Sequence, residues 1–163
     1  MIADRRRAFN ARFTDAQYGR YRALLEDRCR TPIGFRLSET PAFLPTALID
    51  ALVEASQTLV GQLLGNPAYR QAADEAVPPE FRLPAGEAQP TYLQVDFGLV
   101  RTTAGLEGRL VELQAFPSLY GFQVAMADAA LEAYGLSEVT PFIHGLSREA
   151  YLALMRRTIV GDH

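Results

Sequence analysis

Two stretches of sequence decide the fold of this chain: Leu93-Gln94-Val95-Asp96-Phe97-Gly98-Leu99 and Val111-Glu112-Leu113-Gln114-Ala115. Apolar and polar residues alternate in both, which is the period of two expected of half-buried β-strands. The segment between them, 102–108, is rich in turn-forming residues and predicts an antiparallel hairpin. We expect the apolar face of this hairpin to be buried, with these residues inside: Val95, Phe97, Val111 and Leu113.

The register of the hairpin determines which polar residues meet. A turn centred near Ala104 or Gly105 places Asp96 opposite Glu112 or Gln114, and directly paired residues share a face of the sheet. The face opposite the apolar one would then carry two acids and two amides, namely Gln94, Asp96, Glu112 and Gln114. Their oxygen atoms suit a hard cation such as magnesium. The same pattern is also typical of the solvated outer face of an antiparallel sheet.

The segment from Glu112 to Gly121, Glu-Leu-Gln-Ala-Phe-Pro-Ser-Leu-Tyr-Gly, resembles part of the glutathione synthetase and glutathionylspermidine synthase families. These are ATP-grasp carboxylate–amine ligases, in which an Asp on one strand precedes a Glu-x-Asn on the next, and a loop of small residues follows. The resemblance implies that Glu112 and Gln114 bind magnesium at the ATP phosphates, with Asp96 orienting the ligands from a second layer. It also implies a substrate site to which three residues contribute: Gln94, Ser118 and Tyr120.

The chain departs from the family pattern at three places. Gln114 stands where the families have Asn, and Gln94 stands about where glutathione synthetases carry a substrate-binding Arg. The residues 117–119 do not reproduce the serine spacing of the family loop. Because the resemblance covers only the hairpin and the loop after it, it implies the superfamily rather than the substrate.

Length and composition limit what the chain can do alone. Its 163 residues, 48% of them hydrophobic, suit a single domain with a core. A complete ATP-grasp ligase needs two further α+β lobes to clamp the nucleotide. All 16 basic residues are Arg, and no Gly-rich phosphate loop ending in Lys is present. We therefore expect residues 1–163 to be the N-terminal piece of a longer protein, inactive alone and binding neither ATP nor magnesium tightly.

The remaining sequence has mostly helical patterns. Thr14, with Gln17 three residues later, is a capping-box signature for a helix to about Arg28. The proline-punctuated segment 31–45 predicts extended structure. Further helices are predicted over 46–64, 67–76, 120–134 and 147–160. The predicted fold class is α+β, mostly helical, with a helical region 1–90, a hairpin region 91–116 packed on helices, and a helical region 117–163.

Charge and cysteine content restrict the partners and the compartment. The net charge of −3 argues against a nucleic-acid partner, although residues 1–30 are rich in Arg. No apolar run is long enough for a membrane span. The single Cys29 permits no intrachain disulfide, and the lack of an export signal favours a reducing cytoplasm. The expected partners are the remainder of the parent chain or a self-associated copy, with a small-molecule carboxylate or amine as ligand.

Two hypotheses of different classes remain open. In the first, the chain is the substrate-side lobe of an ATP-dependent carboxylate–amine ligase, in which a carboxylate is activated as an acyl phosphate and captured by an amine. In the second, it is a non-catalytic binding or protein-interaction module that kept the hairpin and lost the chemistry. The sequence gives neither Cys29 nor His144 the partner that a nucleophile or a general base requires, so neither is assigned a catalytic role.

Overall fold

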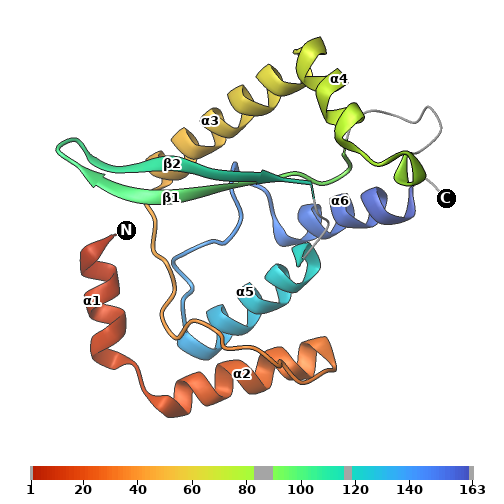
Figure 1. The fold of residues 1–163 in the computed structure, drawn as a ribbon. Helices are drawn as coiled ribbons and strands as arrows, with labels where there is room; N and C mark the ends of the chain where they lie inside the picture. The colour runs from red at the N-terminus through yellow and green to blue at the C-terminus, as the bar shows by residue number, and fades with distance from the viewer. Residues whose placement is uncertain (1, 83–89, 116–118, 162–163) are drawn as a thin grey trace. The chain divides into compact units, whose positions relative to one another are not determined.

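The computed structural model describes residues 2–82, 90–115 and 119–161 (Figure 1). These residues form six α-helices, one 3₁₀ turn and one two-stranded antiparallel sheet, so the fold is α+β and mostly helical, as predicted. In chain order the elements are α1 (Ala3–Arg12), α2 (Asp15–Cys29), α3 (Thr46–Leu64), α4 (Pro67–Ala76), the 3₁₀ turn η1 (Pro79–Phe81), β1 (Gln94–Thr102), β2 (Gly105–Gln114), α5 (Tyr120–Tyr134) and α6 (Arg148–Val160).

The chain divides into two compact units, which are described separately below. The helical unit comprises residues 1–44 and 117–163, and therefore holds α1, α2, α5 and α6. The hairpin unit comprises residues 45–116 and holds α3, α4, η1 and both strands. Residues far apart in the sequence thus build one unit, while a continuous segment builds the other.

The helical unit has a well-packed core around α2 and α5. The ring of Phe9 meets Tyr134 edge-on, with 5.0 Å between the ring centroids. The hydroxyl of Tyr18 donates a hydrogen bond of 3.0 Å to the carbonyl oxygen of Leu37, which ties the proline-punctuated segment to α2. Full burial of one such large apolar side chain contributes about 1.5–3 kcal/mol. The core consists of Phe9, Tyr21, Leu25, Ile33, Leu37, Phe43, Ala129, Ala133, Tyr134 and Leu136.

Charged residues on the surface of the helical unit also link α2 to α5. Glu132 of α5 accepts hydrogen bonds from Arg28 at 2.6 Å and from Arg20 at 3.4 Å. These contacts, with the Arg28 hydrogen bond the largest, lower the pKa of the Glu132 carboxyl. Ion pairs at such exposed positions contribute little to stability. The buried apolar residues, rather than these charges, therefore hold the two helices together.

One buried hydroxyl in this core has no hydrogen-bond partner among the residues that the structure describes. It is the hydroxyl of Tyr134. Burial raises the pKa of Tyr134 to about 12, with smaller contributions from neighbours that include Tyr21. A buried polar group without a hydrogen bond costs free energy, because it loses its contacts with water and gains none in return. Tyr134 therefore stabilises the core through its ring and destabilises it through its hydroxyl.

The helix ends follow ordinary capping chemistry, and the cap predicted at Thr14 is present. The side chain of Thr14 accepts a hydrogen bond of 3.2 Å from the backbone N–H of Gln17, which begins α2. Asn66 begins α4 in the same way, and Ser147 begins α6. Gly135 ends α5 in the left-handed conformation, with φ of 63°, that glycine adopts without steric cost.

The sequence pattern does not predict α1, because residues 3–12 carry charged groups on most sides and show no apolar stripe. One aromatic anchor holds this helix in place, since Phe9 is only 2% exposed. Arg5 adds an ion pair with Glu138 at 3.1 Å, and the N–H of Ile2 donates to the carbonyl oxygen of Phe43 at 2.7 Å. These three contacts join residues that are distant in sequence, so a local sequence pattern cannot predict them.

In the hairpin unit, α3 packs against β2 at a glycine. A Cβ atom built at Gly108 would collide with the side chain of Leu52 and would lie 3.1 Å from the ring of Phe97. Glycine at this position therefore allows the helix to approach the strand closely. At 19 residues α3 is the longest helix, and no helix in the described ranges is long and apolar enough to span a membrane.

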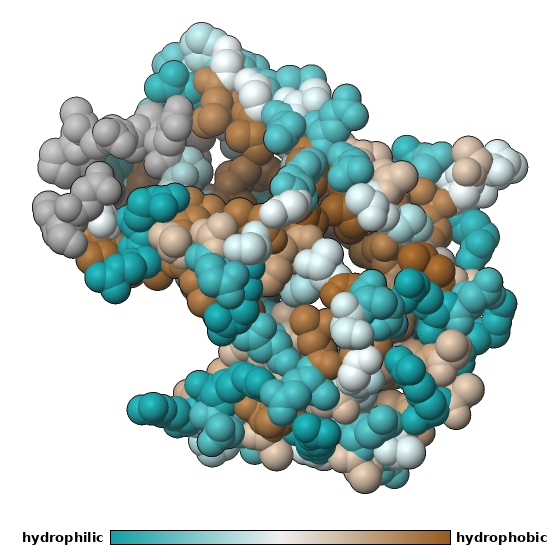
Figure 2. Space-filling view, turned by 180° about the vertical axis from the view of Figure 1, so that it is seen from behind, coloured by the Kyte–Doolittle hydropathy of each residue, from teal (hydrophilic) through white to brown (hydrophobic). Residues whose placement is uncertain are grey.

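The described part of the hairpin unit lacks a buried core. None of the residues described between 45 and 115 reaches the burial found throughout the core of the helical unit. Several large apolar side chains are instead open to solvent, and Figure 2 shows apolar side chains lying among polar ones at the surface. The exposed large apolar residues of this unit are Leu64, Tyr69, Val77, Phe81, Leu99, Val100, Leu110 and Val111.

Candidate functional site

A β-bulge determines which residues face one another across the hairpin. From the tip inward the register is regular as far as Phe97, which pairs with Leu110. Between Phe97 and Asp96 it shifts, so that Asp96 pairs with Glu112 and Val111 is left without a partner. A regular ladder of the same sequence would place Val111 opposite Asp96. The extra residue therefore makes the pairing of the two acids possible.

The bulge also explains why the prediction for Val111 is wrong. This side chain was expected on the buried apolar face, yet it is 67% exposed. A Cβ atom built at Gly98 would lie 3.5 Å from Cγ2 of Val111, and Gly98 shares a face with Asp96 because the two are two residues apart. Val111 therefore lies on the polar face. The other apolar residues expected to be buried are only partly so: Val95, Phe97 and Leu113.

Four of the predicted site residues meet on this polar face of the hairpin. Gln94 pairs with Gln114, and Asp96 pairs with Glu112. The side-chain Nε2 of Gln94 donates a hydrogen bond of 2.8 Å to Oδ1 of Asp96. The Nε2 of Gln114 donates to Oδ2 of Asp96 at 3.2 Å and to Oε1 of Glu112 at 3.1 Å. Each carboxylate oxygen of Asp96 is thus held by one amide, which fixes its orientation.

The arrangement fits a cation only after one local change. As placed, Gln114 turns its NH₂ group, and not its oxygen, toward both carboxylates. An amide flip of Gln114 would exchange the two atoms and bring a third oxygen beside those of Asp96 and Glu112. Glu112 is exposed and therefore free to reorient. No group of three or more His, Cys, Asp or Glu within the described ranges is placed to hold a metal ion, so an amide oxygen would be needed.

The two remaining predicted site residues, Ser118 and Tyr120, do not belong to the hairpin unit. Ser118 lies outside the described residues, so its role in substrate binding stays a prediction. Tyr120 is the first residue of α5 and belongs to the helical unit, whereas the four clustered residues belong to the hairpin unit. Its carbonyl oxygen accepts a hydrogen bond of 3.2 Å from the hydroxyl of Tyr151, which anchors the start of α5 to α6.

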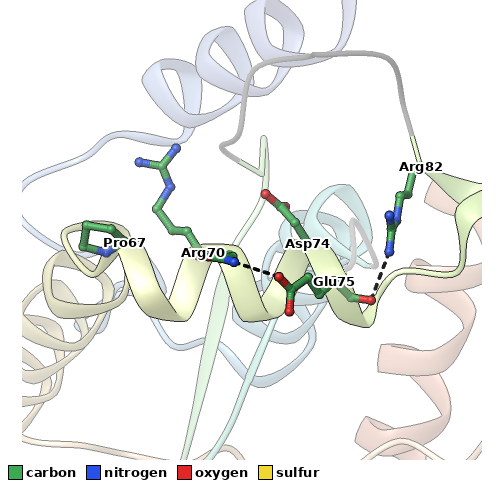
Figure 3. A pocket seen from close by; sticks show the side chains of 6 residues that line it. Pro67, Arg70, Asp74, Glu75 and Arg82 are labelled. Carbon is green, nitrogen blue, oxygen red and sulfur yellow. Dashed lines mark hydrogen bonds between the residues drawn. The ribbon is translucent and has the colours of Figure 1, made fainter.

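Two hollows occur in the hairpin unit that the sequence analysis does not predict. One, of about 490 Å³, lies between α3 and β1 and is mostly apolar, with lining residues Ser56, Gln57, Val60, Gly61, Leu93 and Val95. The other, of about 350 Å³, lies on α4 and is rich in charged groups (Figure 3). Its lining residues are Pro67, Arg70, Gln71, Asp74, Glu75 and Arg82.

The charged hollow depends on Arg82, which folds back onto the end of α4. Its Nε donates to the carbonyl oxygen of Val77 at 2.8 Å, and its Nη2 donates to that of Glu75 at 3.1 Å. Basic side chains commonly satisfy the last carbonyl groups of a helix in this way. The sequence offers no signal for this contact, because Arg82 follows η1 and not the helix that it caps.

Comparison of the chain with protein-family models, with curated proteins and with solved structures found no match.

Proposed function

We propose that the hairpin unit is the metal-facing, substrate-side part of an ATP-dependent carboxylate–amine ligase of the ATP-grasp kind. The observation that carries this proposal is the pairing of Asp96 with Glu112 at the bulge, with Gln94 and Gln114 on the same face. The resemblance of the segment from Glu112 to Gly121 to the glutathione synthetase-like families requires such an Asp beside the Glu-x-amide strand. The alternation of the strands alone would suit a solvated face equally well.

The proposed roles follow from the contacts of each side chain. Glu112, exposed at the rim, and Gln114, after an amide flip, bind magnesium through oxygen atoms. Asp96 orients Gln114 through the hydrogen bond at its Oδ2, and Gln94 holds its Oδ1. When bound, magnesium would offset the charge on the ATP phosphates as a substrate carboxylate is converted to an acyl phosphate. An amine then displaces the phosphate and forms the amide bond.

Several parts of this function lie beyond the residues of the cluster. Gln94, Ser118 and Tyr120 are proposed to border the carboxylate or amine substrate. The nucleotide itself would be bound by another part of a longer protein, in the cytoplasm. The proposal therefore requires the reading frame to continue past His163 into a nucleotide-binding region.

A matched pair of substitutions tests the metal assignment. In the longer protein, Glu112→Ala should abolish ATP-dependent ligation and leave the fold intact. The control is Glu107→Ala on the same strand, since Glu107 also carries a carboxylate but pairs with Arg109 at 3.0 Å near the tip. It should leave ligation unchanged. Full ligation activity in the Glu112→Ala variant would show that Glu112 is not a required metal ligand and would contradict the proposed function.

One observation favours a second candidate, a binding module without catalysis. The amides of Gln94 and Gln114 already donate to both carboxylate oxygens of Asp96 and to one of Glu112, so these contacts form without a cation. A cluster of this kind can serve simply to fix the hairpin register. Under this alternative, Glu112→Ala and Glu107→Ala would have equally small effects, and magnesium would not alter the hairpin.

A further inference from the structure

The charged hollow on α4 contains one cation and one anion that pair with no other side chain among residues 2–82, 90–115 and 119–161. Glu75 is occupied, because its carboxylate accepts a hydrogen bond of 2.8 Å from Gln71, and Arg82 is occupied by two backbone carbonyls. Arg70 and Asp74, in contrast, form no side-chain hydrogen bond or ion pair with the part of the chain that the structure describes. Both side chains lie on the same side of α4 in Figure 3.

The separation of the two free charges leaves room for a small molecule between them. Residues four apart in a helix are displaced by about 6 Å along its axis. Arg70 and Asp74 could reach one another at this spacing, yet they do not pair. An Arg preceding an Asp by four residues is also the less favourable order for an ion pair within a helix. The charges are thus available to a ligand that carries one group of each sign a short distance apart.

We propose that this hollow binds a small zwitterion of the amino-acid type, with its carboxylate on Arg70 and its ammonium group on Asp74. The planar guanidinium of Arg suits a carboxylate, and the Asp carboxylate accepts hydrogen bonds from an ammonium group. An aliphatic substituent of the ligand would lie against the ring of Pro67, which forms part of the lining. A volume of about 350 Å³ is sufficient for a molecule of this size.

The charges of the hollow favour a zwitterion over a simple anion. Two basic and two acidic residues line it, so its net charge is zero. A dianion such as phosphate would bind beside Asp74 and Glu75, whose charges repel it. A zwitterion brings no net charge and satisfies both free groups. The hollow shares no residue with the polar cluster of the hairpin, so this proposal goes beyond the proposed function and is independent of it.

Three probes that share the isobutyl group of leucine test the proposal on the isotope-labelled full chain. L-leucine carries both charges, 4-methylpentanoate lacks the ammonium group, and 3-methylbutylamine lacks the carboxylate. We expect leucine to shift the amide NMR signals of residues 67–82 in a saturable manner. Each singly charged probe should bind at least about tenfold more weakly, because it loses one charge-assisted contact. Equal responses to all three probes would overturn the proposal.

Substitutions then assign each charge to its residue. Arg70→Gln and Asp74→Asn should each weaken leucine binding by about tenfold, and Arg70→Gln should make leucine and 3-methylbutylamine bind equally. Arg157→Gln on α6 is the matched control, since Arg157 is an exposed helical arginine outside the hollow, and it should change nothing. Unaltered leucine binding in both α4 variants would contradict the assignment. Neither ATP nor magnesium is needed, so failure here leaves the ligase proposal untouched.

Discussion

The helical unit and the hairpin unit bury their apolar residues to very different extents. In the helical unit Leu25 has no exposed surface, and its neighbours pack around it in a continuous core. In the hairpin unit Phe81 is 72% exposed and Leu110 is 51% exposed. The two units also differ in charge, because residues 45–116 hold 4 Arg against 9 acids, whereas the helical unit holds 12 Arg against 10 acids.

The packed core therefore lies in one unit of the chain, and the candidate site lies in the other. A two-stranded hairpin is at best marginally stable alone and needs a helix or further strands against its apolar face. The polar cluster therefore lies in the unit that has fewer buried contacts to stabilise it. Segments with few buried contacts open at low free-energy cost, as is usual for regions that bind ligands. Native-state amide hydrogen exchange can report on each unit separately, and the following predictions use it.

The largest effect is expected from removing a core side chain of the helical unit. Leu25→Ala should lower the free energy of unfolding of that unit by about 2–5 kcal/mol, because it leaves a cavity in a packed core. Leu52→Ala, at a partly exposed position of α3, should cost the hairpin unit only about 1 kcal/mol. Equal losses of unfolding free energy in the two units, measured by hydrogen exchange, would contradict the expected difference in their packing.

The next effect concerns the contact between α3 and β2. Gly108→Ala introduces a Cβ that collides with the side chain of Leu52 and crowds the ring of Phe97, so these side chains or the helix must shift. We expect a loss of about 1–3 kcal/mol, the usual cost of overpacking, confined to exchange in the hairpin unit. Gly98→Ala is the control on β1, because its added Cβ meets only ordinary contacts. A loss shared by the helical unit would show that the two units are energetically coupled.

A smaller effect of opposite sign is expected at Tyr134. Tyr134→Phe removes a buried hydroxyl that has no partner and should stabilise the helical unit by about 1 kcal/mol. It should also remove a pH dependence. The folded protein keeps the Tyr134 proton up to a pKa of about 12, whereas the unfolded chain releases it near 10.0, so this residue costs stability as pH rises between these values. Denaturation measured at pH 9 and pH 11 should show a smaller decline for the Phe variant.

The smallest effect is expected at the bulge residue itself. Val111→Thr keeps the β-branched shape and changes an exposed side chain, so stability should change by less than about 0.5 kcal/mol. Leu113→Thr, two residues along the same strand and partly buried, should cost more. A cost for Val111→Thr as large as that for Leu113→Thr would restore the original prediction that Val111 belongs to the apolar face. Thermal denaturation of the two variants measures the difference.

Local chemistry was enough to predict most of the elements. The capping residues Thr14, Asn66 and Ser147, and the stop at Gly135, act within a few residues of the helices that they delimit. Helix α1 was not predicted from the local sequence pattern. It is held by Phe9, which packs into a core built from residues distant in sequence. The division into two units was likewise not predicted, since residues 1–44 join residues 117–163 across more than 70 intervening residues.

The candidate site was predictable in composition and only partly in geometry. The alternation placed Gln94 and Asp96 together correctly. The predicted pairing of Asp96 with Glu112 is present, but it arises from the bulge, because the register set at the turn would otherwise place Val111 opposite Asp96. The bulge was not predicted, because an inserted residue on one strand leaves both alternating patterns intact on either side of it. The hollow on α4 was missed for another reason, since one of its lining residues, Arg82, comes from beyond η1.

The bulge at Val111 also protects the hairpin against unwanted association. The described sheet has only two strands, so each strand presents one edge of unpaired backbone groups. Such an edge, beside exposed residues such as Leu110, is a template on which other chains can stack into aggregates. An extra residue in β2 breaks the regular spacing of N–H and C=O groups along that strand and twists it locally. An incoming strand can therefore match β2 on only one side of the bulge at a time, so the edge of β2 is not a continuous template for fibril growth.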